Sequence, residues 1–147
     1  MKRNKYLQKN PITGDGWQVF SEVSFDLSAL DIGPHAKALM SEMNAAIKSG
    51  LPIVVIILAA TIVDVLSNED NIIQGYRDDA SGISMDWLTA SERRQLDWLR
   101  GLRNKLVHYE GVIAGMGGTD FDQELLRKDA NRALLAISPL LSGLEQF

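Results

Sequence analysis

The longest apolar run in the chain, residues 51–66, limits the possible folds more than any other segment. Its many β-branched residues would suit a strand, but about 15 residues without a turn signal exceed the usual strand length. No partner strand is evident elsewhere. The run also contains Pro52, Thr61 and Asp64, and falls short of the roughly 18 to 20 apolar residues that a membrane span needs. We therefore predict a buried helix beginning at Pro52, central in the domain or shared with another subunit.

Two further helices are predicted on either side of a polar stretch. Pro34 suits a first helical position, and apolar residues then recur on one face until Gly50. Residues 68–88 are rich in glycine and aspartate and predict at most a brief helix and a loop. Thr89 and Glu92 then form a capping box that begins a helix running to about Tyr109.

A last helix follows a glycine-rich loop, residues 111–118. Thr119 or Asp120 is expected to cap this helix, and Pro139 to kink or restart it. The fold class predicted is all-α: a four-to-five-helix antiparallel bundle that forms a dimer. Residues 1–27, with scattered aromatics and no helical period, are assigned to an N-terminal arm, and residues 28–147 to a single helical domain.

Composition narrows the functional classes. The chain of 147 residues has no cysteine, which excludes disulfide frameworks, thiol catalysis and cysteine-based zinc sites. Two distant histidines make any zinc site improbable, so we expect no metal and no cofactor. A net charge of −4 argues against a surface built entirely for nucleic acid, although a local basic patch remains compatible with it. We expect a cytoplasmic protein with no signal peptide and no membrane partner.

Arg103 has an unusual place on the helix that begins at Thr89. Leu99, Leu102 and Leu106 define the apolar face of that helix, and Arg103 falls within the same arc. A guanidinium there needs an ion-pair partner or must reach water along its own stem. Asp64 is the candidate partner, because a carboxylate within an apolar helix also needs a cation; alternatively, Asp64 faces water at the helix end.

His108 lies about 140° around the helix from Arg103, on a second stripe with Asp97, Gly101 and Asn104. A glycine at the centre of such a stripe would permit close approach of another helix. The stripe therefore predicts a contact surface, plausibly of a homodimer, unless it is an ordinary solvated face.

The string from Leu102 to Glu110, LRNKLVHYE, resembles the signature of the HEPN superfamily, small all-helical domains marked by Arg, four to six residues and His. The asparagine after the arginine, the apolar pair before the histidine and the preceding hydrophobic helix agree with that family. The resemblance implies a dimer in which two Arg-His pairs face a shared cleft. Many such proteins are metal-independent endoribonucleases, often toxins or defence proteins with a cognate antitoxin. Others bind nucleotide or RNA without known cleavage.

One toxin subgroup of that family has a tyrosine two residues after the histidine, which a partner protein can modify. In this chain Glu110 holds that position and Tyr109 lies one residue earlier. Regulation by this route is therefore doubtful, and Tyr109 is retained as a supporting residue of the site.

The chemistry of these residues fits RNA cleavage independently of the family. Such cleavage without a metal needs a proton carrier near neutral pH and a cation beside the phosphate. His108 at a helix C-terminus would be the general acid, Arg103 would hold the phosphate, and Asn104 would bond the phosphate or orient the histidine. The basic residues proposed to contact the RNA backbone, or otherwise to form a solvated face, are Arg93, Arg94, Arg100 and Lys105. His35, beside a helix start, is taken as a surface residue.

Three functional hypotheses remain open. The first is a homodimeric, metal-independent endoribonuclease that uses Arg103 and His108 of both subunits. The second is a non-catalytic module that holds nucleotide, RNA or a partner protein in the same cleft. The third is a helical dimerisation or accessory protein in which Arg103 and Asp64 form only a structural pair.

Overall fold

The computed structural model describes residues 23–73, 87–109 and 111–144, and for residues 69–73 the backbone alone. Within these ranges the chain is all-helical and contains no strand. Its elements are a short 3-10 helix, η1 (Leu27–Ala29), and four α-helices, α2 (Pro34–Lys48), α3 (Pro52–Ile73), α4 (Ala90–His108) and α5 (Asp120–Ser142).

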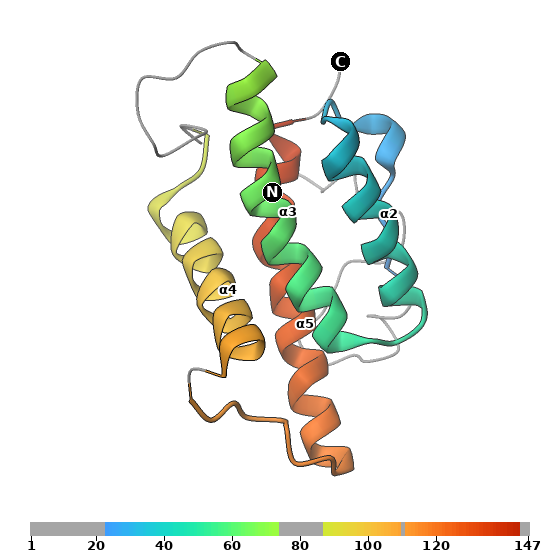
Figure 1. The fold of residues 1–147 in the computed structure, drawn as a ribbon, viewed down its shortest axis with the longest axis vertical. Helices are drawn as coiled ribbons and strands as arrows, with labels where there is room; N and C mark the ends of the chain where they lie inside the picture. The colour runs from blue at the N-terminus through green and yellow to red at the C-terminus, as the bar shows by residue number, and fades with distance from the viewer. Residues whose placement is uncertain (1–22, 74–86, 110, 145–147) are drawn as a thin grey trace.

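Helix α3 is the centre of the arrangement. Successive helices run in opposite directions, and α3 contacts α2, α4 and α5 (Figure 1). Its apolar residues are fully buried at positions such as Ile56, Ala59 and Val63. The apolar run thus forms the central helix that the sequence predicts, because apolar residues all round a helix must meet neighbours on several sides.

Two helices extend further than the local sequence signals indicate. Helix α3 continues to Ile73, so the region predicted to form at most a brief helix and a loop begins as an extension of the central helix, and residues 74–86 of that region lie outside the described residues. Helix α5 continues through Pro139 to Ser142, so the predicted restart is wrong and the predicted kink stays a prediction. Proline removes one backbone hydrogen bond and crowds the preceding turn, and the burial of Leu140 and Leu141 holds the last turn in place.

Trp87 packs across the C-terminal end of α5. Its indole Nε1 donates a hydrogen bond to the carbonyl oxygen of Pro139 at 3.1 Å. The ring lies directly against Gly143, the residue that caps α5, and leaves no room there for a Cβ atom. The chain three residues before the start of α4 is therefore held against the end of α5.

Residues 23–30 cover α2. The amide of Phe25 donates to Asn44 Oδ1 at 2.9 Å, and Asn44 Nδ2 donates to the Phe25 carbonyl at 3.0 Å. Val23 and Phe25 belong to the predicted N-terminal arm, residues 1–27, but both are buried in the core. The rest of the predicted arm, residues 1–22, lies outside the described residues.

The predicted helix starts are confirmed. Thr89 and Glu92 form the capping box of α4, and Thr119 with Asp122 forms a second one at α5. The glycine-rich loop rests on α5, because Gly115 is buried where a Cβ atom would lie 2.9 Å from Leu126 Cγ. No helix within the described ranges has a stretch that could span a lipid bilayer.

Candidate functional site

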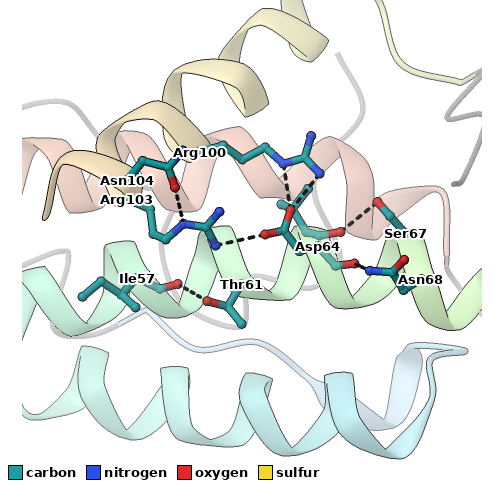
Figure 2. Close-up of polar contacts among 9 residues, drawn as sticks. Ile57, Thr61, Asp64, Ser67, Asn68, Arg100, Arg103 and Asn104 are labelled. Carbon is teal, nitrogen blue, oxygen red and sulfur yellow. Dashed lines mark hydrogen bonds and ion pairs between the residues drawn. The ribbon is translucent and has the colours of Figure 1, made fainter. Parts of the chain in front are cut away.

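A polar stripe runs along the central helix where it faces α4. Thr61, Asp64 and Asn68 lie at spacings of three and four residues, which places them on one side of α3. Thr61 Oγ1 donates back to the Ile57 carbonyl at 2.8 Å, and Asn68 Nδ2 donates to the Asp64 carbonyl at 2.9 Å (Figure 2). Both side chains are therefore occupied within their own helix, whereas the Asp64 carboxylate is directed at α4.

Asp64 binds two arginines of α4 at once. Its Oδ1 accepts from Arg100 Nε at 2.9 Å and lies 2.7 Å from Arg100 Nη2, while its Oδ2 accepts from Arg103 Nη1 at 3.0 Å (Figure 2). The ion pair expected between Asp64 and Arg103 is present. Both carboxylate oxygens of Asp64 bind arginines, so the alternative in which this side chain simply faces water does not hold, although it is 35% exposed.

Arg100 belongs to the site, which the sequence did not lead us to expect. The sequence pattern grouped it with the basic residues proposed to contact RNA, yet it shares the carboxylate of Asp64 with Arg103. The signal was available, because residues three apart on a helix lie on the same side and a partner of Arg103 is then within reach of Arg100. Two guanidinium groups and one carboxylate leave the cluster Asp64, Arg100 and Arg103 with a net positive charge.

Asn104 fixes the orientation of Arg103 from the other side. Its Oδ1 accepts from Arg103 Nε at 3.1 Å, so the guanidinium is held between an amide and a carboxylate. The Arg103 side chain is 20% exposed, against 40% for Arg100. Arg103 is thus the more enclosed of the two, with its planar donor group at the margin of the core.

His108 is the last residue of α4, and its side chain is exposed. Five helical positions correspond to about 7.5 Å along the axis and about 140° around it, so Arg103 and His108 leave the helix in different directions. Among the described residues, no hydrogen bond or ion pair links His108 to Arg103 or Asn104. Within one chain, Arg103 is directed at α3 and His108 at solvent.

The stripe predicted as a contact surface is open in the single chain. Asp97, Gly101 and His108 are exposed, and Asn104 is half-buried. A Cβ atom built on Gly101 would have no neighbour within 4 Å among the described residues. Glycine in a helix interior is less favourable than alanine by about 0.5 to 1 kcal/mol, and no contact with the described part of the chain explains its presence.

The predicted RNA-binding residues do not form one cluster. Arg93 and Arg94 are exposed near the start of α4, and Arg93 has an interaction of its own. Lys105 is exposed near the other end, while Arg100 is held by Asp64. The basic residues therefore extend along the length of α4.

Tyr109 ends α4 in an unusual conformation. Its φ of 51° and ψ of 60° lie in the left-handed region, and it is the one non-glycine residue with positive φ in the described ranges. Glycine or asparagine is preferred at such a position, and another residue costs on the order of 1 kcal/mol. The side chain is 81% exposed, so burial does not offset that cost.

No group of three histidine, aspartate or glutamate side chains gathers around a potential metal position in the described part of the chain. His35, the other histidine, is exposed on the first turn of α2, away from the motif.

Comparisons of this chain with protein-family models, with curated proteins and with solved structures found no match.

Proposed function

We propose that this protein is a metal-independent endoribonuclease of the HEPN type, active as a homodimer in the cytoplasm. The observation that carries the proposal is the placement of the Arg-Asn-His motif. Arg103 is fixed by Asp64 and Asn104 at the edge of a positively charged cluster, and His108 is exposed at the end of the same helix. A toxin or defence role, with a cognate antitoxin as partner, would follow from the resemblance to that superfamily.

A second subunit is part of the proposal because one chain directs Arg103 and His108 apart. Helix α4 has an open face around Gly101 on which the same helix of a second copy could lie. A twofold contact there would bring the two copies of His108 together, with the arginine cluster of each chain on the side of its own α4 that faces α3.

The residues then have distinct tasks in the reaction. The ribose 2′-oxygen attacks the phosphorus and the bond to the 5′-oxygen breaks, leaving a 2′,3′-cyclic phosphate and a 5′-hydroxyl. One imidazole accepts the proton of the 2′-hydroxyl, and the other, in its protonated form, donates a proton to the departing 5′-oxygen. Arg103 stabilises the charge on the non-bridging oxygens.

The test is cleavage of single-stranded RNA in excess chelator by the full chain. His108→Ala and Arg103→Ala should each reduce the rate at least about 100-fold while circular dichroism and melting temperature show a folded protein. His35→Ala is the matched control, because it removes the other imidazole outside the motif. Cleavage by either motif variant at the wild-type rate would overturn the assignment.

A second function, a non-catalytic HEPN-like module for nucleotide, RNA or a partner protein, has one observation in its favour. Arg103 is already held by a carboxylate and an amide of its own chain, as in a structural ion pair. Such a module would bind a nucleotide in an Arg103-dependent titration and degrade no RNA at high protein concentration. In the third hypothesis, a helical dimerisation or accessory protein in which the pair is only structural, replacing Asp64 and Arg103 together with leucine would leave function intact.

A further inference from the structure

Tyr109 combines two features that folding of this chain does not favour. Its backbone is left-handed at the end of α4, where glycine would be unstrained, and the residue is 81% exposed. Strained residues concentrate at functional sites, and tyrosine is enriched among the residues that contribute most to binding energy. Their coincidence in one residue indicates a task that needs an aromatic ring at this point.

The surroundings of the ring indicate what it binds. Tyr109 directly follows His108, and the exposed Lys105 lies one turn before it on α4. Arg100 and Arg103 of the positively charged cluster also belong to the second half of α4, whereas Asp64 belongs to α3. An aromatic ring and cations on one stretch of chain are a combination with which proteins hold unpaired nucleotides, the ring stacking on a base and the cations meeting the phosphates.

We propose that Tyr109 is the stacking platform for an unpaired nucleobase of the bound RNA. This inference rests on the proposed function, because the base that Tyr109 would bind is the one next to the phosphodiester cleaved at His108. A base in a duplex is already stacked on both faces and cannot lie on the ring.

The aromatic character of the contact separates this proposal from a protein interface. Val107 and Val112 are also exposed, at 51% and 90%, so the end of α4 offers some aliphatic surface to a partner protein. A protein contact would depend on apolar area and would accept leucine in place of Tyr109. Base stacking requires a planar ring and would accept phenylalanine or tryptophan but not leucine.

The experiment measures binding of a fluorescein-labelled 2′-O-methyl oligonucleotide of 12 residues, which lacks the attacking hydroxyl, by anisotropy with the full chain. Tyr109→Phe and Tyr109→Trp should bind within about twofold of wild type, whereas Tyr109→Leu and Tyr109→Gly should bind roughly 5-fold to 150-fold more weakly. A self-complementary duplex of the same chemistry should bind all five proteins alike. Tyr109→Asn, also suited to the left-handed conformation, provides a second ring-free variant that folds.

Wild-type affinity in Tyr109→Gly and Tyr109→Asn would overturn the stacking role, and so would equal affinity of the leucine and phenylalanine variants. A change in molecular mass, measured by light scattering, that explains the loss of oligonucleotide affinity would overturn it as well. His108→Ala separates this proposal from the proposed function, because it should retain oligonucleotide binding while losing cleavage. Tyr109-dependent binding by a protein that never cleaves RNA would refute the nuclease and leave the stacking platform standing.

Discussion

Asp64 Oδ2 lies 3.0 Å from Arg103 Nη1, and this ion pair joins the central helix to the first residue of the Arg-Asn-His motif. The same carboxylate also holds Arg100. One acidic side chain therefore keeps two guanidinium groups together at the margin of the core. Removal of the Asp64 carboxylate should therefore lower the stability of the fold and raise the positive charge of the arginine cluster.

Asp64→Asn should lower the free energy of unfolding by on the order of 1 to 2 kcal/mol, because two partly exposed arginines lose a charged acceptor. The loss is moderate since Asp64 is 35% exposed and water screens the pair. Urea denaturation would measure it.

The same variant makes the cluster more positive. If the cluster meets phosphate, RNA should bind more tightly at low salt and with a steeper salt dependence, while cleavage slows because Arg103 is less well oriented. Glu42→Gln, an exposed carboxylate of α2, is the control that should change neither property. A variant as stable as wild type would show that the pair contributes nothing to the fold.

Gly101→Ala tests the open face of α4. In an isolated chain the new methyl group meets nothing within 4 Å, so stability should rise by about 0.5 to 1 kcal/mol from the better helix propensity. If a second α4 lies on this face, the methyl group should instead weaken the dimer. Sedimentation at several concentrations, together with thermal melting, distinguishes the two. A more stable protein of unchanged mass would exclude close helix contact at Gly101.

Gly143→Ala should destabilise the protein by about 1 to 3 kcal/mol, because the indole of Trp87 already occupies the space of a Cβ atom. Thermal denaturation followed by circular dichroism would report the loss. The double variant Gly143→Ala with Trp87→Leu should recover part of it, since leucine can move aside. Additive losses in that double variant would contradict the packing described here.

Asp122 should contribute stability that depends on pH. Hydrogen bonds from Thr119, chiefly from its hydroxyl, lower the pKa of the Asp122 carboxyl below its usual value of 3.8. An acid whose pKa is lower in the folded state stabilises the fold above the unfolded pKa and loses that contribution as pH falls through the folded pKa. Wild type should therefore exceed Asp122→Asn in stability above about pH 4, and the two should converge in more acidic solution.

Asp129 provides a control of opposite sign. Burial raises its pKa above 3.8, although Arg132 partly offsets the effect. The charged form is therefore disfavoured in the folded state, and Asp129→Asn should be more stable than wild type at neutral pH, with the gain disappearing as pH falls below about 4. Parallel pH profiles for the two variants would show that these pKa directions are wrong.

Local signals in the sequence were sufficient for the helix starts. The capping boxes at Thr89 and Thr119 depend on side chains three residues apart, so the sequence alone contains the whole interaction. The long apolar run likewise had to be central. The end of α3 and the absence of a restart at Pro139 depend on packing against neighbouring helices, which local propensity does not decide.

The candidate site was predictable only in part. A carboxylate in an apolar helix and an arginine on an apolar face each need a partner, which is why Asp64 and Arg103 could be paired from the sequence. Arg100 could have been added to this pair, because it lies three residues before Arg103 on the same side of α4. The left-handed backbone of Tyr109 could not be predicted from the sequence, because glycine and asparagine favour that conformation and tyrosine does not.

Helix α2 is attached to the remaining helices differently from the others. Its contacts with the described elements are made with α3 and η1, whereas α3, α4 and α5 all touch one another. Opening of α2 would therefore break its packing on α3 and its hydrogen bonds with Phe25, while the three remaining helices would keep their mutual packing. Amide hydrogen exchange should show α2 opening as a separate unit at lower free energy, while the amides in the middle of α3 exchange only on global unfolding.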